Sequence, residues 1–414
     1  MKVPKNENGK KRKILIMSAP IGSGHQMAAD ALVEALSRLK DVEVVQGNVF
    51  AFFPSVLGRF FLNSYARILQ YCPGLYALSY RWGNQSNGSL WMRNLINAVL
   101  LRLGRSFIKT VHPDFVFSTH ATPTGIFSLY KQTYDSDLWL GVVVTDFTVH
   151  RWLFCPGVDA YFLADEKLFP QVCGHTDGQK ASPEPAARYG LLQSGNERDG
   201  SGTRERWEEA GLYAFGIPVR AAFACQKESA NTRKEVRARF GWDEDAFVCL
   251  FAGGGAGMLP MEELLQQLRH ADLEMVHVVA VTGHNEPLRR KLTEREASFW
   301  NSRLAVLGFT DEMPQLMQAA DIVITKAGGV SLAECLACGT EIVIYQPLPG
   351  QEQANAAFVQ KEYAIKVAVN ANELADRLRQ AAAVSPSVRI QSREQRRQAY
   401  GHADAAERIA DLLQ

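Results

Sequence analysis

The chain has 414 residues, of which 47% are hydrophobic and 21% charged, and its formal net charge is only +1. This length is enough for two domains with separate cores, and the near-neutral charge argues against a protein that coats nucleic acid. No apolar run approaches the roughly 20 residues that span a bilayer. The basic segment before Ile14 leads into an apolar run that is too short for a signal peptide. Together with the seven scattered cysteines, which favour a reducing compartment, these features predict a cytoplasmic protein.

The first half of the chain alternates between apolar strands and helices. A strand at 13–17 leads into a Gly-rich loop, Ser18–His25, and a helix at 26–39. Further strands are predicted at 42–47, 115–118, 139–145 and 160–164. This alternation is typical of a doubly wound parallel sheet.

The second half repeats the same order of elements. Strands are predicted at 247–252, 275–282, 304–307, 320–325 and 341–345, with helices at 260–268, 286–296, 330–338 and from 351 onwards. Between the halves, residues 174–206 are polar and Gly-rich, which predicts a flexible linker or insertion. We therefore expect an α/β fold with two Rossmann-like domains facing across a cleft. The predicted segments are a domain over 1–170, a linker over 171–210, a domain over 211–395, and a last helical segment over 396–414 that packs back on the first domain.

Two loops near the C-terminus carry the most specific signal. The segments Lys326–Glu334 and Pro349–Asn355 each follow a predicted buried strand and open a helix. Consecutive units of one parallel sheet place such loops at the same edge, where ligands of these folds bind. Free N–H groups at the two helix starts suit a diphosphate, and Glu334 is placed to accept the hydroxyls of a ribose. The amides and carboxylate of Gln351, Glu352 and Asn355 offer the donors and acceptors that a sugar needs, so the pattern predicts a nucleotide-sugar site.

Two other features belong with this predicted site. The loop Gly253–Gly257 follows an apolar strand, and glycines there let the backbone approach a phosphate closely. Arg220 lies at the crossing between the halves, where its guanidinium can meet the same diphosphate or make a surface salt bridge instead.

Two residues of the first half are candidates for a general base. His25 ends the first Gly-rich loop, and Asp146 ends the predicted strand at 139–145. A carboxylate at the end of a parallel strand is placed for chemistry, although it can also cap a turn. The sequence leaves open which of the two is the base.

No metal site is predicted. The acidic tripeptides Asp135–Asp137 and Asp243–Asp245 lie in polar loops, each without a second candidate ligand group beside it, and are expected to be solvated turns. Cys335 and Cys338 form a single pair without a second one to complete a zinc site, so we expect them in the core.

The stretch from Val44 to His112 contains no Asp or Glu but several aromatic and basic residues. Its basic residues are Arg59, Arg67, Arg81, Arg93, Arg102, Arg105 and Lys109, and its aromatic residues include Phe50, Phe52, Phe53, Phe60, Phe61, Tyr65, Trp82 and Trp91. This composition fits a face that docks on an anionic membrane, with many of the aromatics also in the core. RNA binding is the competing interpretation, but no RNA-binding motif accompanies it.

These motifs resemble the family 28 glycosyltransferases, in the branch of monogalactosyldiacylglycerol synthases and processive diacylglycerol glucosyltransferases. The similar segments are Ser18–His25, Thr145–His150, Gly216–Arg220, Lys326–Glu334 and Pro347–Asn355. They cover nearly the whole chain except the linker, which is unusually long, and Ala221 replaces the proline that usually follows the arginine of Gly216–Arg220.

The resemblance implies a GT-B fold and an inverting, metal-independent transfer from a UDP-sugar to the 3-hydroxyl of diacylglycerol. Its donor-side residues would be Gly254, Gly255, Gly328, Gly329, Ser331, Glu334, Gly350, Gln351, Glu352 and Asn355, with Arg220 at the diphosphate and the backbone of Phe309 at the uracil. His25 and Asp146 would serve the acceptor side, and Gly24 would bind substrate. The UDP-sugar is a co-substrate, no cofactor is expected, and the expected location is the inner face of the cell membrane.

Two alternatives remain at this stage. One is a UDP-N-acetylglucosamine transferase that acts on a polyprenyl-linked peptidoglycan precursor, although the Thr145–His150 and Pro349–Glu352 segments favour the glycerolipid branch. The other is a non-catalytic nucleotide or lipid sensor. The presence of His25, Asp146, Arg220 and Glu334 argues against it. The sequence does not distinguish glucose from galactose as the transferred sugar.

Overall fold

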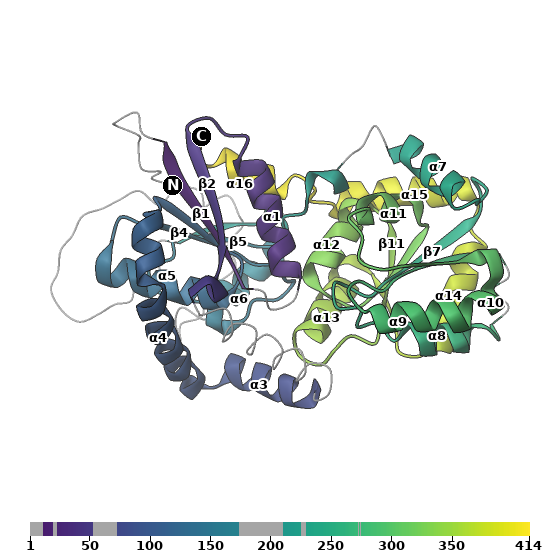
Figure 1. The fold of residues 1–414 in the computed structure, drawn as a ribbon, viewed down its shortest axis with the longest axis horizontal. Helices are drawn as coiled ribbons and strands as arrows, with labels where there is room; N and C mark the ends of the chain where they lie inside the picture. Colours follow the sequence, from purple (N-terminus) through teal and green to yellow (C-terminus); the bar gives the residue numbers. More distant parts are fainter. Residues whose placement is uncertain are drawn as a thin grey trace. The chain divides into compact units, whose positions relative to one another are not determined.

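The computed structural model describes residues 11–19, 23–52, 73–173, 210–224, 229–271, 273 and 275–414. These residues form an α/β protein with two six-stranded parallel sheets, shown in Figure 1. The chain divides into two compact units, each described here by itself. Unit 1 comprises Met1–Ile21, Ala28–Ile217 and Ala405–Gln414, and unit 2 comprises Gly22–Met27 and Pro218–Asp404. Of the predicted linker over 171–210, residues 174–209 lie outside the described residues, and Gln171–Cys173 are the end of the short helix α6 (Phe169–Cys173).

Unit 1 contains a sheet with the strand order β2-β1-β3-β4-β5-β6. The strands are β1 (Arg12–Ser18), β2 (Val42–Asn48), β3 (Phe115–Ser118), β4 (Trp139–Val143), β5 (Ala160–Phe162) and β6 (Gly211–Tyr213). The first five were predicted, although β4 and β5 each end two residues early. Apolar side chains such as Ile14, Phe117 and Phe162 form the core of this unit.

The main helices of unit 1 are α1 (Gly24–Leu36), α3 (Pro73–Gln85), α4 (Asn87–Val111), α5 (Ala121–Tyr134) and α16 (Ala405–Asp411), with short turns at η1 (Val49–Phe52), η2 (Arg151–Leu153), η3 (Glu166–Leu168) and α6 (Phe169–Cys173). The hydroxyl of Ser86 caps the start of α4, and His112 ends it in the left-handed conformation. Ala406 and Ile409 of α16 belong to the same core as α1, and Figure 1 shows the yellow α16 in this unit. The end of the chain therefore completes the first sheet's hydrophobic layer.

Unit 2 contains a sheet with the strand order β12-β11-β10-β7-β8-β9. The strands are β7 (Phe247–Ala252), β8 (Val276–Val281), β9 (Leu304–Leu307), β10 (Ile322–Thr325), β11 (Glu341–Tyr345) and β12 (Lys366–Ala368). The first five correspond to the predicted strands. All neighbours pair in parallel, so the carboxyl ends of β7, β10 and β11 lie side by side at one edge.

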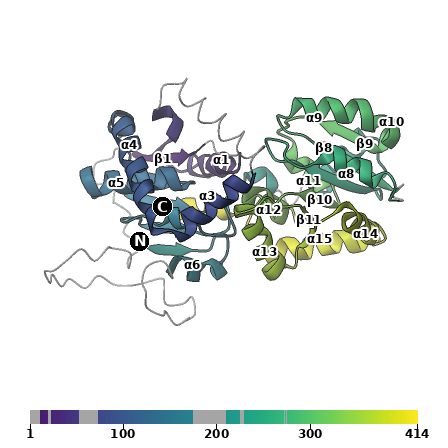
Figure 2. The same ribbon diagram turned by 90° about the horizontal axis from the view of Figure 1, so that it is seen from below.

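The helices of unit 2 are η5 (Ala221–Phe223), α7 (Ser229–Arg239), α8 (Met261–Leu268), α9 (Glu286–Lys291), α10 (Ala297–Trp300), η7 (Asn301–Arg303), α11 (Met313–Ala319), α12 (Gly329–Ala337), α13 (Gln351–Tyr363), α14 (Ala371–Ala382) and α15 (Pro386–Tyr400). Leucines of α8 and α14 share one core with the sheet. α8 connects β7 to β8, whereas α11 and α12 connect β9 to β10 and β10 to β11, in the opposite direction along the sheet. Because such crossovers are right-handed, α11 and α12 lie on the face opposite to α8. Figure 2 shows unit 2 from a second side. Within the described residues no helix is both long and apolar enough to cross a bilayer.

One helix prediction was wrong in its continuity. The single helix predicted over 286–296 is instead α9 followed by a π-helical turn, Leu292–Glu296. Glu296 at the end of this turn is completely buried and pairs with Arg269 at 2.8 Å. A π-helical turn is wider than an α-helical one and shifts the following side chains around the helix axis. Here it accompanies the buried carboxylate of Glu296, which contacts Arg269.

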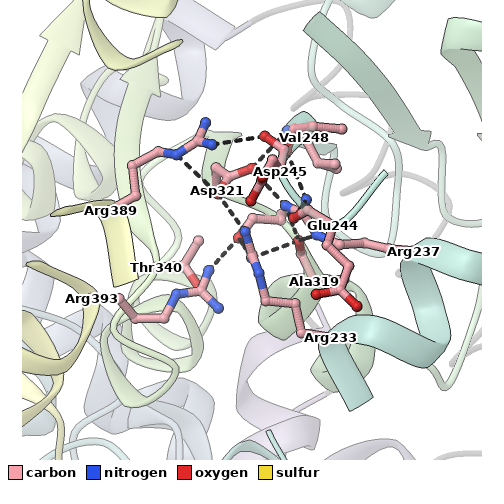
Figure 3. Close-up of polar contacts among 12 residues, drawn as sticks. Arg233, Arg237, Glu244, Asp245, Val248, Ala319, Asp321, Thr340, Arg389 and Arg393 are labelled. Atoms are coloured by element: carbon pink, nitrogen blue, oxygen red, sulfur yellow. Dashed lines mark hydrogen bonds and ion pairs between the residues drawn. The ribbon is translucent and has the colours of Figure 1, made fainter. Parts of the chain in front are cut away.

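A buried carboxylate surrounded by arginines joins several elements of unit 2 (Figure 3). Asp321 directly precedes β10 and binds Arg233 at 2.6 Å and Arg237 at 2.7 Å. It also accepts the N–H of Val248 at 2.8 Å, and Arg389 of α15 lies at 3.7 Å. Burial acts to raise the pKa of Asp321, but these arginines and the Val248 N–H together hold it below its ordinary value. The cluster therefore ties α7, α15 and two strands together at the amino edge of the sheet.

Candidate functional site

The two C-terminal loops meet at the carboxyl edge of the second sheet, as the sequence predicted. β10 and β11 are neighbours, and α12 and α13 begin at Gly329 and Gln351. The side-chain amide of Asn355, which is completely buried, donates to the carbonyl of Ala327 at 3.0 Å. Asn355 therefore joins the two loops, and its amide nitrogen serves the architecture rather than being open to a sugar.

Glu334 lies in α12 with its side chain almost completely buried. Burial raises the pKa of this carboxyl to about 7, and the opposing effect of Arg220 is smaller. Within the described residues the buried Nε of Arg220 has no hydrogen-bond partner. A buried carboxylate and a guanidinium with a donor left over are both groups that a polar ligand would satisfy.

The Gly-rich loop after β7 has the close packing that requires glycine. At Gly257, with φ of +62°, an added Cβ would lie 2.1 Å from the carbonyl of Thr282. Gly254 also has positive φ, but an added Cβ there would meet none of the described atoms within 4 Å. One side of the loop is therefore packed against the segment after β8, and the backbone at Gly254 is open to an approaching group. At Gly255 the carbonyl accepts the N–H of His284 at 2.9 Å.

Phe309 lies two residues after the end of β9 and is half exposed. Its ring stacks on the imidazole of His284, with centroids 4.3 Å apart and an angle of 9°. Sequence reasoning missed His284, although its position two residues after the end of the predicted strand 275–282 was a usable signal. The pair forms a flat aromatic surface beside the Gly-rich loop.

The start of α13 shows what the predicted sugar-binding residues contact. The N–H of Leu348 donates to the carboxylate of Glu352 at 2.7 Å. Burial lowers the pKa of Lys326, and the nearby charge of Glu352 opposes this effect. Gly350 caps α13 with φ of +97°, a conformation that favours glycine. Glu352 therefore fixes the loop before α13, and Gln351 is the first residue of that helix.

The N-terminal turn of α12 carries three more of the predicted residues. Gly328 is the N-cap, and Gly329 and Ser331 lie in the first turn. An added Cβ at Gly328 would meet only the hydroxyl of Ser331, at 3.9 Å, among the described atoms. The first N–H groups of a helix are orphan donors, and this turn is uncrowded, so anion binding there stays a prediction.

The predicted acceptor-side residues belong to different units. Gly24 and His25 lie in the first turn of α1, within the segment Gly22–Met27 that groups with unit 2, and His25 is half-buried. Asp146 lies in unit 1, three residues beyond the end of β4. Which of the two is a general base stays a prediction.

Aromatic residues surround the segment after Asp146. The imidazole of His150 packs between Tyr80 of α3 and Trp152, at centroid distances of 4.8 and 6.0 Å. Burial and then the charge of Asp146 raise the pKa of Tyr80 well above its ordinary value. Sequence reasoning missed Tyr80, because α3 lies more than sixty residues before this loop.

The basic, aromatic stretch forms a partly apolar surface on α4. Side chains at four-residue intervals, Trp91, Leu95, Val99 and Leu103, are exposed, and Trp91 is 70% exposed. We call these four residues the α4 apolar stripe. Arg81, Arg102, Arg105 and Lys109 are also exposed.

One basic residue was wrongly assigned to this surface. Arg93 is buried and donates to the carbonyl of Phe154 at 2.8 Å. Phe52 is buried as well and contacts Phe107 in the core. Arg59, Arg67, Phe53, Phe60, Phe61 and Tyr65 lie outside the described residues.

Among the described residues no group of three or more His, Cys, Asp or Glu side chains could hold a metal ion. Cys335 of α12 and Cys338, the C-cap of this helix, are free, buried thiols, as expected for core residues.

Comparison with known proteins assigns both parts of the chain. Residues 25–178 match the family "Monogalactosyldiacylglycerol (MGDG) synthase", and residues 248–409 match the "Glycosyltransferase family 28 C-terminal domain". A processive diacylglycerol beta-glucosyltransferase of Bacillus licheniformis is 25% identical, with 87% of this chain and 84% of that protein covered. A probable monogalactosyldiacylglycerol synthase 2 of Oryza sativa subsp. japonica is 26% identical, with 84% of this chain and 69% of that protein covered.

Solved structures share the fold at low sequence identity. Acinetobacter baumannii MurG has a TM-score of 0.57 at 16% identity, with 97% of this chain and 99% of that chain covered. A UDP-glucosyltransferase from Polygonum tinctorium has a TM-score of 0.58 at 13% identity, with the same shares covered. These likenesses, together with the two parallel sheets, identify the GT-B fold class. With an MGDG synthase segment followed by a family 28 C-terminal domain, the chain belongs to the diacylglycerol glycosyltransferases of family 28.

Proposed function

We propose that the protein transfers a hexose, from UDP-glucose or UDP-galactose, to the 3-hydroxyl of 1,2-diacylglycerol with inversion at the anomeric carbon. The observation that carries the donor side is the pair formed by the buried Glu334 and the partly exposed Arg220 in unit 2. Its carboxylate is suited to accept ribose hydroxyls, and the spare Nε–H of its guanidinium is suited to the diphosphate. The names of the relatives support diacylglycerol as the acceptor.

The reaction needs one base and stabilisation of the departing UDP. His25 or Asp146 takes the proton of the acceptor hydroxyl as its oxygen attacks the anomeric carbon from the side opposite UDP. The bond from that carbon to the diphosphate breaks, and the negative charge stays on UDP. Arg220 and the N–H groups at the start of α12 stabilise this charge.

Purified protein incubated with radiolabelled UDP-glucose or UDP-galactose and diacylglycerol vesicles tests this proposal. We expect labelled glycosyldiacylglycerol from one of the two donors. Most of the activity should be retained in excess chelator. The stabilising groups are protein cations and N–H donors, so removal of free Mg²⁺ or Mn²⁺ should change the rate little. No lipid product from either donor contradicts the proposed function, and activity that requires added metal contradicts its metal-free form.

We further propose that the α4 apolar stripe docks on an anionic membrane, on the cytoplasmic face of the cell membrane. The acceptor is a membrane lipid, so the enzyme has to reach the bilayer surface. The stripe runs along one line of α4 because its residues are spaced by four. The region from 44 to 113 has no acidic side chain to repel anionic lipid, and each exposed cation near such a surface contributes about 1 kcal/mol.

Replacing Arg81, Arg102 and Lys109 together with Gln should weaken binding to anionic vesicles by about two orders of magnitude, from three contributions of about 1 kcal/mol. The dependence of binding on salt should fall as well. Cosedimentation with vesicles of anionic phospholipid measures both effects. The control replaces Arg289, Arg290 and Lys291 of α9 with Gln, which removes the same charge from another exposed helix. Equal binding by the two triple variants would rule out this docking face.

A further inference from the structure

The environment of His150 in unit 1 is built by α3. The imidazole lies 4.8 Å from the ring of Tyr80, at an interplanar angle of 55°. On α3 one turn later, an added Cβ at Gly83 would come within 3.3 Å of Cε1 and Nε2 of His150. The ring of one α3 residue and the backbone of another therefore pack against the same imidazole.

The segment that carries His150 is attached to the junction of α3 and α4 by hydrogen bonds. The side chain of Asn84 accepts the N–H of Arg151 at 2.9 Å. The indole N–H of Trp152 donates to the hydroxyl of Ser89 at 3.4 Å, which in turn donates to the carbonyl of Gly83 at 2.9 Å. These contacts set the distance between α3 and the 150–152 segment.

The chemical state of the two rings also follows from their contacts. Nδ1 of His150 accepts the N–H of Trp152 at 3.1 Å, so a neutral imidazole carries its proton on Nε2. The phenol of Tyr80 stays protonated because burial and the charge of Asp146 raise its pKa. Tyr80 thus feels the charge of Asp146, a predicted base, and packs against His150.

We propose that Tyr80 is a positioning residue of the acceptor site, whose ring holds the imidazole of His150 in a fixed orientation near Asp146. This inference rests on the proposed function, in which the segment Thr145–His150 serves the acceptor. It assigns the role to the aromatic ring, which packs against His150. Phe is therefore a conservative replacement at this position, and Leu is not.

Steady-state kinetics with UDP-sugar and diacylglycerol vesicles separate this role from a general structural one. We expect Tyr80→Leu to lower kcat by about 10- to 100-fold, since small misplacement of catalytic groups has effects of this size. The KM for the UDP-sugar should be unchanged, and Tyr80→Phe should retain activity within about threefold of the wild type. The matched control is Tyr134→Leu, a half-exposed tyrosine of the same unit whose ring contacts Tyr130 and Arg105, which should leave kcat unchanged.

A double-mutant cycle tests whether Tyr80 acts through His150. The variant with both Tyr80→Leu and His150→Ala should be no slower than His150→Ala alone, because residues that act as one unit are not additive. Additive losses would overturn the inference. So would a Tyr80→Phe variant as slow as Tyr80→Leu, or a Tyr80→Leu variant as fast as the wild type.

Proton NMR of the His150 ring gives a readout that needs no turnover. The Hε1 resonance, identified by its loss in His150→Ala, should carry a ring-current shift in the wild type and in Tyr80→Phe, and lose it in Tyr80→Leu. A resonance unaffected by Tyr80→Leu would overturn the proposed packing. A wild type that shows this shift but forms no glycolipid would instead contradict the proposed function.

Discussion

Replacing Glu334 with Gln is expected to abolish tight binding of UDP and, at the same time, to make the protein more stable at pH 8. The binding effect follows from the loss of charge-assisted hydrogen bonds to ribose hydroxyls, which contribute roughly 1.5–3 kcal/mol each. Loss of two such bonds would raise the Kd of UDP by about 100-fold or more. Isothermal titration calorimetry with UDP measures this change.

The stability effect follows from the raised pKa of the carboxyl. The folded pKa of about 7 lies above the carboxyl's ordinary value of 4.5. Between these two pH values the folded state therefore holds a proton that the unfolded state has released. Stability therefore falls as the pH rises from about 4.5 to 7, and the cost above pH 7 is on the order of 3 kcal/mol. Gln does not ionise, so the variant should lack this part of the pH dependence. Urea unfolding at pH 5 and pH 8 measures the difference.

The same carboxyl predicts how donor binding depends on pH. If ribose hydroxyls donate to the ionised form, the affinity of the wild type for UDP should rise about tenfold between pH 6 and pH 8. Glu244→Gln is the matched control, since Glu244 is an exposed glutamate of unit 2 that pairs with Lys234 at the surface. If Glu334→Gln binds UDP as tightly as the wild type, Glu334 does not bind the ribose. If the stability of Glu334→Gln depends on pH as that of the wild type does, the pKa of Glu334 is not raised.

The second large effect is expected at Asp321, far from the ligand edge. Asp321→Asn should destabilise unit 2 by about 3–5 kcal/mol, the usual result of removing one partner of a buried ion pair. Arg237 is only 1% exposed and would keep its charge in the interior without its carboxylate. Because the pKa of Asp321 is lowered, the stability it provides is present above the carboxyl's unfolded value of about 3.9 and lost as the pH falls through the folded value.

Denaturant unfolding followed by the loss of UDP binding reports on this unit. The control is Asp376→Asn, which removes an exposed carboxylate that pairs with Arg379, and surface pairs of this kind contribute about 0–1 kcal/mol. Equal stabilities for the two variants would show that the arginine cluster is balanced by the carbonyls at the end of α11 rather than by Asp321. Arg233, Arg237 and Arg393 do donate to those carbonyls, so the comparison separates the two sources of stability.

Much of the architecture followed from local patterns in the sequence. The strands at 115–118, 247–252, 304–307 and 341–345 have the predicted bounds, because short apolar runs between Gly-rich or polar loops have few other stable arrangements. The meeting of the loops after β10 and β11 followed from parallel topology alone, and Asn355 now shows the contact. Family motifs in both halves were sufficient to place the chain among the family 28 glycosyltransferases.

Other properties were decided by contacts between residues far apart in the chain. Burial of Arg93 depends on the carbonyl of Phe154, 61 positions away, and two of the arginines of Asp321 come from one helix, α7, 84 and 88 positions before it. The approach of Tyr80 to His150 needs α3 to pack against α4 and η2. A local pattern reports the periodicity of burial and the chemistry of turns, so the sequence by itself determined the elements, their order and the edge where the loops gather. The charge state of Glu334 and the partners of each buried ion depend on dielectric and distance, which exist only once the chain has packed, so the tertiary structure alone decided them.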